Sequence, residues 1–152
     1  MQLTPNFSLE QLSHSETAQR EGIDNMPGAD IVDNLRRLAE GLERVRILTG
    51  HPLEISSAYR CPELNRRVGG ASRSQHTQGL AADFTCAGFG APADIIKAIC
   101  ASGIEFDQCI LEYAQWVHIS FSQAPRGRVL SIHDAAQGYL DGLRDASGKQ
   151  IA

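Results

Sequence analysis

The sequence predicts an α+β fold, in which helices pack on a small, largely antiparallel sheet. Residues 27–49 repeat apolar side chains at alternating steps of four and three, which is typical of an amphipathic helix. Later segments alternate apolar and polar residues, which is typical of half-buried strands. With 152 residues and 42% hydrophobic content, the chain is long enough to form one domain around its own core.

The first third of the chain is predicted to be helical. A short helix begins where Ser8 and Gln11 have the spacing of a capping box. The long helix of residues 27–49 ends before Gly50 and Pro52. Its stripe of core-facing residues consists of Ile31, Leu35, Leu38, Leu42, Val45 and Leu48.

Strands and shorter helices are predicted for the rest of the chain. A short turn at Ala114 and Gln115 favours an antiparallel hairpin. The tail from about residue 138 is polar, contains glycine and is expected to be loosely held. In order, the predicted elements are a strand at 53–57, a helix from Pro62 to the glycines at 69–70, a strand at 80–86, a helix at 92–102, hairpin strands at 108–113 and 117–121, and an edge strand at 129–132.

The stretch from Ser74 to Asp83 holds the first two candidate metal ligands. It places the imidazole of His76 and the carboxylate of Asp83 seven residues apart, and Zn²⁺ accepts both groups as ligands. We expect His76 at the end of a loop and Asp83 on the strand that follows. On that strand Asp83 shares a face with Ala81 and Thr85, away from the more apolar face. Two ligands do not make a site, so a third is needed.

The third ligand is predicted on the hairpin. Within residues 116–120, His118 falls on the more polar face of its strand. His133 competes for this role, but it lies beyond the predicted edge strand. His14 and His51 lie beside helix ends and are expected to be inert.

Composition and cysteine spacing restrict other functions. The formal charge of −4 and the absence of a basic stripe give no support for a nucleic-acid partner. The first residues lack the pattern of a signal peptide, and no segment approaches the length of a membrane span. Without Cys-x-x-Cys spacing, the cysteines are expected to be core residues or free thiols, and a disulfide between Cys100 and Cys109 stays open. The other two are Cys61 and Cys86, and none is assigned to the metal.

Taken together, these motifs resemble the zinc D-Ala-D-Ala carboxypeptidase family. That family includes bacterial D,D-carboxypeptidases, vancomycin-resistance D,D-dipeptidases and phage endolysins, and it shares a fold with hedgehog signalling domains. The chain is most similar to the short branch found in phages and bacterial genomes, over residues 6 to about 120. The motifs that carry the likeness are Ser74-x-His76-x-x-Gly79-x-Ala81-x-Asp83 and Trp116-Val117-His118.

The resemblance implies one Zn²⁺ ion held by His76, Asp83 and His118. It also implies that Arg60 stabilises the carbonyl or carboxylate of the substrate, and we assign Ser74 to substrate binding as well. Three protein ligands with an open fourth position are the pattern of a catalytic zinc site rather than a structural one.

The general base is less directly indicated. Many family members have an acid three residues before the last histidine, where this chain has Gln115, and others have a histidine where it has Trp116. Glutamine cannot accept a proton from water. We therefore choose Glu112, because hedgehog domains carry a glutamate at the same offset. Asp107 is the reserve, and the alternative for Glu112 is a carboxylate that simply faces solvent.

These expectations combine into a single zinc peptidase domain over residues 1–152. The resemblance implies an endolysin-like D,D-carboxypeptidase or endopeptidase that cuts a peptidoglycan stem-peptide or cross-link bond next to D-alanine. The protein is expected to be a monomer and to have no membrane partner. Made in the cytoplasm, it would reach the cell wall through another system, such as phage lysis or a virion. The alternatives are a non-catalytic, zinc-stabilised binding or virion-structural module of the same fold, and an amidase that cuts between sugar and peptide.

Overall fold

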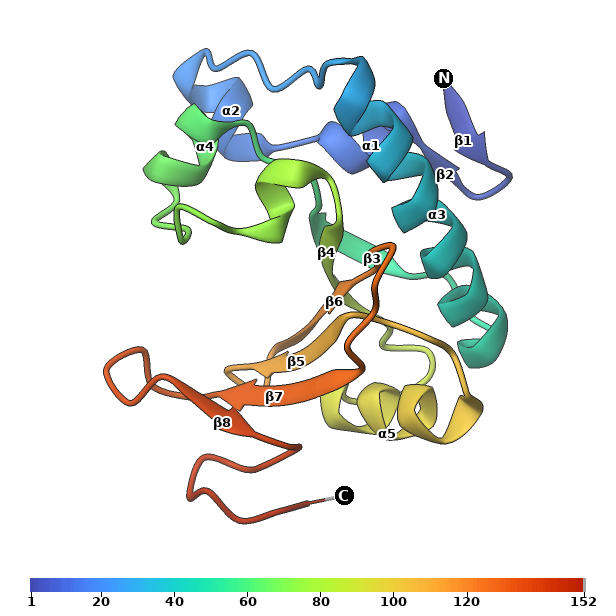
Figure 1. Ribbon diagram of the computed structural model, residues 1–152, viewed down its shortest axis with the longest axis vertical. Coiled ribbons are helices and arrows are strands. Elements are labelled where there is room, and N and C mark those ends of the chain that lie inside the picture. The colour runs from blue at the N-terminus through green and yellow to red at the C-terminus, as the bar shows by residue number, and fades with distance from the viewer. Residues whose placement is uncertain (152) are drawn as a thin grey trace.

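A computed structural model describes residues 1–151 and confirms the α+β class (Figure 1). Its main sheet has the strand order β3-β4-β6-β5-β7-β8. Neighbouring strands are antiparallel except for β5 and β7, so the sheet is largely antiparallel as predicted. The strands are β3 (Glu54–Ser57), β4 (Ala81–Thr85), β5 (Gln108–Glu112), β6 (Trp116–Ser120), β7 (Arg128–Ile132) and β8 (Tyr139–Asp141).

The helices begin and end close to the predicted positions. Ser8 caps the first helix, because its Oγ accepts a hydrogen bond from the backbone N–H of Gln11 at 3.0 Å. The long helix ends at Gly50, whose φ of 68° is left-handed. Besides a small N-terminal sheet of β1 (Gln2–Thr4) and β2 (Phe7–Ser8), the remaining elements are α1 (Leu9–Ser13), α2 (Glu16–Glu21), α3 (Ala29–Thr49), α4 (Pro62–Arg67), the 3₁₀-helix η1 (Gln75–Gln78) and α5 (Pro92–Ser102).

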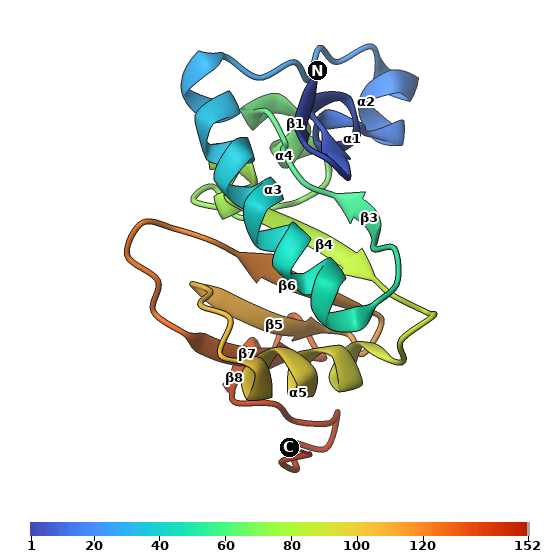
Figure 2. The ribbon, with the colours of Figure 1, turned by 90° about the vertical axis from the view of Figure 1, so that its right-hand side faces the viewer.

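Helices α3 and α5 cover one face of the main sheet (Figure 2). The middle of the α3 stripe, from Leu35 to Val45, is buried there as its spacing predicts, and Ile31 and Leu48 pack against it partly buried. The isoleucines of α5 complete the same core. The sheet residues on this face are apolar, and they include Phe84, Val117 and Ile119. Because apolar side chains occupy this buried face, the polar side chains of the same strands project from the opposite face.

The prediction of a loosely held tail from about residue 138 is wrong. Residues of β8 pair with β7, so β7 lies inside the sheet and β8 forms the edge. Two contacts that the polar composition does not reveal hold this segment in place. Leu143 is buried in the main core, and Ser131 Oγ donates to the Gly142 carbonyl at 2.8 Å. The expected edge strand at 129–132 is therefore an inner strand.

Two further expectations can be compared with the described residues. All four cysteines are free in this part of the chain, so Cys100 and Cys109 do not form a disulfide. Across residues 1–151, no helix combines the length and the apolar character needed to cross a bilayer.

Gly41 of α3 allows the helix to approach Phe121 closely. A Cβ at this position would lie 2.4 Å from Cε2 of the buried Phe121 ring. Replacing glycine by alanine inside a helix ordinarily stabilises it by roughly 0.5–1 kcal/mol. Here we predict the opposite sign: Gly41→Ala lowers the free energy of unfolding by about 1–3 kcal/mol in urea titrations. Adding Phe121→Leu should recover part of that loss, and purely additive losses would contradict the steric explanation.

Candidate metal centre and its cleft

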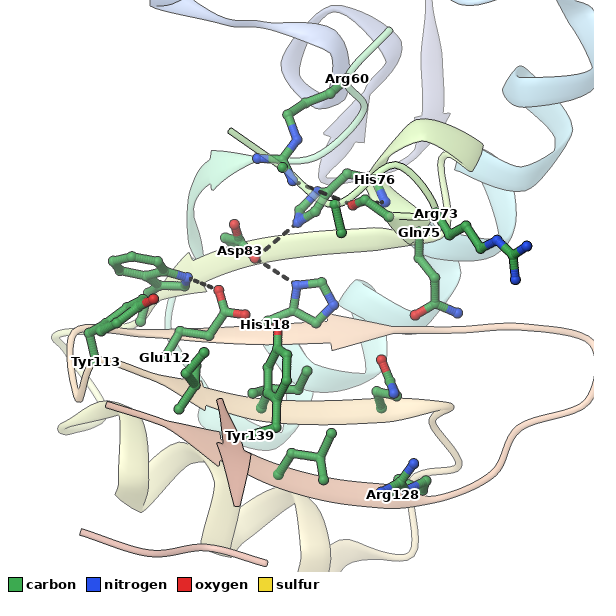
Figure 3. Close-up of a pocket in the computed structure, with 18 of the residues that line it drawn as sticks. Arg60, Arg73, Gln75, His76, Asp83, Glu112, Tyr113, His118, Arg128 and Tyr139 are labelled. Atoms are coloured by element: carbon green, nitrogen blue, oxygen red, sulfur yellow. Dashed lines mark hydrogen bonds and ion pairs between the residues drawn. The ribbon is translucent and has the colours of Figure 1, made fainter. Parts of the chain in front are cut away.

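Three ligand-type side chains converge on the uncovered face of the sheet. Asp83 of β4 and His118 of β6 are direct cross-strand partners, and His76 of η1 reaches the same point from the side. Their ligand atoms all lie within 4.8 Å of one another (Figure 3). The three residues are buried, with exposed fractions of 2% for His76 and 8% each for Asp83 and His118. The structure thus brings together the three residues expected to hold the metal.

Each histidine turns a ring nitrogen toward the same carboxylate oxygen. His76 Nε2 lies 3.2 Å from Asp83 Oδ1, and His118 Nδ1 lies 2.9 Å from it. His76 Nδ1 donates to the carbonyl of Ala58 at 2.7 Å, which fixes the ring with its Nε2 toward Asp83. A hydrogen bond from the far ring nitrogen to a carbonyl is the usual support of a metal-binding histidine. His76 lies in a 3₁₀-helix rather than in the expected loop.

The electrostatics of the group favour a bound cation. Burial raises the pKa of Asp83, but hydrogen bonds with His118 and His76 outweigh it and hold the pKa well below its usual range. Asp83 is therefore an anionic acceptor in a nearly dry position. Two imidazole nitrogens and one carboxylate oxygen form a donor set that Zn²⁺ accepts. The residues present therefore fit a zinc ion.

Glu112 faces this group rather than bulk solvent (Figure 3). It is half-buried at the end of β5, and Trp116 Nε1 donates to its Oε1 at 2.8 Å. Burial raises the pKa of Glu112. The hairpin turn keeps Glu112 directly opposite Trp116, although it uses left-handed φ angles of 56° at Tyr113 and Ala114. The sequence shows no Asn-Gly signal for such a turn.

Arg60 and Ser74 lie on the wall of the cleft opposite the sheet. Arg60 Nη2 is 3.5 Å from Ser74 Oγ, and the buried Arg60 Nε has no hydrogen-bond partner among the described residues. Burial lowers the pKa of Arg60, while Asp83 and Glu112 act to raise it. Ser74 also caps η1, because its Oγ accepts from the N–H of His76 at 3.2 Å. Arg60 is thus placed beside the candidate metal group with donors to spare.

Strand register arranges the polar face of the sheet in three rows. Alternate residues of a strand face the same side, so each row crosses the sheet from strand to strand. The rows bound an open cleft of about 750 Å³. They are a metal row of Asp83, His118, Ile110, Leu130 and Asp141, a carboxylate row of Trp116, Glu112, Ile132 and Tyr139, and an arginine row of Ser120, Gln108 and Arg128.

Comparison with known proteins agrees with this geometry. The sequence profile of the family Peptidase M15 matches residues 5–120, which is most of the chain. The protein belongs to the Peptidase M15 family. M15 proteins are zinc peptidases, so membership indicates a peptidase and agrees with the His–Asp–His group. No curated protein matches the chain.

Two residues that competed for roles in the M15 site lie elsewhere. His133 Nε2 is 2.7 Å from the carbonyl oxygen of Arg144, outside the group formed by the three ligands. Asp107, the reserve base, is buried beneath Arg126 and does not line the cleft. Its carboxylate accepts hydrogen bonds from Arg126 Nε and Nη2 at 2.8 Å each and from Gln75 Nε2 at 2.8 Å.

Sequence reasoning missed the residues at the far end of the M15 cleft. Arg73, Arg126 and Arg128 line that end, and Tyr139 of β8, in the carboxylate row, was missed as well. Alternation along 129–132 extended by one residue would have placed Arg128 on the same face as Leu130. No sequence signal links Arg126 to Asp107, because the pair is formed by a loop that returns between β6 and β7.

The ion pair between the buried Asp107 and the half-exposed Arg126 predicts a specific loss of stability in acid. Arg126 and Gln75 lower the pKa of Asp107 from 3.8 to about 2. A lowered native pKa contributes stability above the unfolded value, and that stability is lost as the pH falls from about 4 to 2. We expect Asp107→Asn to cost about 1–2 kcal/mol at pH 7, allowing for the half-exposed Arg126. The difference from the native protein should shrink as the pH falls from about 4 and vanish only below about 2 in urea titrations. Asp141→Asn, which alters an exposed aspartate, should show almost no difference at either pH.

Proposed function

We propose that this protein is a zinc-dependent peptidoglycan peptidase that hydrolyses a stem-peptide or cross-link bond next to D-alanine. One observation carries the proposal: Glu112, with a pKa raised by burial, faces the His–Asp–His group across an open cleft. A catalytic metallopeptidase needs this combination, whereas a zinc site that only stabilises a fold has no use for it. An endolysin-like role in phage lysis is the setting that the resemblance favours, with the protein acting as a monomer.

His76, Asp83 and His118 would hold the zinc ion. When bound, zinc supplies a Lewis acid for the substrate carbonyl and lowers the pKa of water from ~15.7 to about 7. The three ligands are themselves buried, which strengthens the electrostatic interactions within the group.

Glu112 is the proposed general base. Trp116 occupies its Oε1, which leaves Oε2 to accept a proton from the attacking water and pass it to the leaving amine. The raised pKa brings this carboxylate closer to neutral pH, where proton transfer in both directions is efficient. Asp107 cannot substitute for it, because its carboxylate is committed to Arg126 and Gln75.

Arg60 is proposed to stabilise the negative charge that develops on the carbonyl oxygen. Arg60 lines the cleft and its Nε has no partner among the described residues, and losing one oxyanion contact typically costs on the order of 10²–10³ in rate. The cleft floor beside His118 is formed by Ile110 and Leu130, which suits a small apolar side chain such as the methyl group of alanine.

The direct test is digestion of purified peptidoglycan, with the products analysed by mass spectrometry. The native protein, a chelated sample, the same sample with zinc restored, and Glu112→Gln would be compared. We expect zinc-dependent release of D-alanine or opening of cross-links, and a loss of about 10²–10⁴ in rate for Glu112→Gln. Glu54→Gln, which changes an exposed strand glutamate, is the matched control and should keep full activity.

Three results would contradict parts of the proposal. Activity retained by Glu112→Gln would reject Glu112 as the base. Products cut between sugar and peptide would indicate an amidase. No hydrolysis by a sample shown to contain zinc would favour the non-catalytic binding or virion-structural module.

A further inference from the structure

One end of the cleft carries positive charge that the proposed reaction does not use. Arg73, Arg126 and Arg128, here called the arginine end, line the cleft on the side of the metal row away from Glu112. Figure 3 shows Arg73 and Arg128 at this end, with Glu112 and Tyr113 at the other. The chain as a whole has a formal charge of −4, so this local excess runs against its overall charge.

The guanidinium groups of the arginine end are largely uncommitted. Arg73 makes no hydrogen bond or ion pair with any residue of the described chain. Arg128 has a distant contact of 3.9 Å with Asp141, whose side chain is 88% exposed. Arg126 uses its Nε and Nη2 atoms on Asp107, which leaves Nη1 for another partner.

Asp107 fixes the orientation of two groups at this end. Its carboxylate is 2% exposed and anchors Arg126 from one side and Gln75 from the other. Because a carboxylate only accepts hydrogen bonds, Gln75 must turn its Nε2 toward Asp107 and its Oε1 away. Gln75 Oε1 is buried and has no partner among the described residues, and Gln75 lines the cleft. The end therefore presents cationic donors, and Asp107 fixes the position of Arg126 among them.

We propose that the arginine end binds a free carboxylate of the substrate, away from the bond that is cut. This inference rests on the proposed function and adds a substrate requirement to it. Arginine recognises carboxylates through paired, charge-assisted hydrogen bonds, which lysine or neutral side chains do not reproduce. Asp141 is the one acidic residue among the described cleft residues at this end, and it is exposed enough to turn away.

Strand geometry sets the distance of this carboxylate from the scissile bond. Arg128 lies two strands across and two residues along from His118. With strands ~4.8 Å apart and a rise of ~3.4 Å per residue, the Cα atoms are about 12 Å apart. The Arg128 side chain covers part of this distance, and an extended peptide advances about 3.3–3.6 Å per residue. The recognised carboxylate therefore lies roughly two or three residues from the scissile carbonyl.

A peptidoglycan stem peptide can supply that carboxylate from two sources. One is the α-carboxyl group of its γ-linked D-glutamate, which lies two residues before the bond to a terminal D-alanine. The other is its C-terminal carboxyl group, which reaches this distance when the cut bond is one residue further from the C-terminus. The test uses four synthetic stem peptides, in which each of these two groups is either free or amidated. The zinc-loaded protein is assayed for kcat and KM, and Glu112→Gln is used to measure Kd by calorimetry without turnover.

We expect amidation of the recognised carboxylate to raise KM and Kd roughly ten-fold and to change kcat little, because half-exposed ion pairs contribute modestly. The double variant Arg73→Gln/Arg128→Gln should raise KM and Kd for the free-acid peptide by the same factor. It should then bind the acid and the amide equally well. Arg36→Gln changes an exposed arginine of α3, on the covered side of the sheet, and should keep the full discrimination. Arg126 is left intact because its loss would expose Asp107.

The outcomes separate this inference from the proposed function. The amidation that matters identifies which carboxylate is bound. Equal cleavage and equal Kd for all four peptides would overturn the arginine subsite and leave the peptidase intact. If the zinc-loaded native protein cleaves none of them, the proposed function fails, and the Kd values for Glu112→Gln still decide whether a carboxylate is recognised.

Discussion

The carboxylate of Asp83, buried between the imidazoles of His76 and His118, is the interaction on which the candidate site depends. A buried anion requires compensation, and here it comes from two ring nitrogens that are also metal-ligand atoms. The main chain fixes both rings, one by strand pairing opposite Asp83 and the other by a hydrogen bond to Ala58. The group is therefore built before any cation arrives, which lowers the entropic cost of binding one.

One face of the sheet packs into the core and contributes stability, and the other face carries the candidate site. Alternation along β4, β5 and β6 directs the apolar side chains to α3 and α5, and it leaves the polar ones on the other side. Strand register then sets the order of the metal, carboxylate and arginine rows. A one-residue slip in any strand would exchange the faces, so core packing and site assembly are enforced by the same pairing. The buried Asp107 adds a second anchor by tying the loop before β7 to η1.

Much of this arrangement could be predicted from local patterns. Periodicity in short stretches of sequence predicts the stripe of α3 and the side of the strands on which Asp83 and His118 lie. The residue types at the helix ends predict the caps. The spacing alone leaves the third ligand open, and the resemblance is what favours His118; the Peptidase M15 profile supports the family itself. The direction in which Glu112 points could not be predicted, because it depends on a hairpin turn with left-handed residues at Tyr113 and Ala114. The same holds for β8 and for the pairing of Asp107 with Arg126, which join segments far apart in the chain and leave no periodic signal.

We propose that His76, Asp83 and His118 form one zinc site facing Glu112. Its most direct test is a crystal structure of the protein prepared with zinc, with anomalous diffraction recorded on both sides of the zinc absorption edge. We predict one strong anomalous peak in contact with these three side chains, and no comparable peak at His133 or the cysteines. A peak at another group of residues, or no peak here in a crystal that contains zinc, would contradict the account.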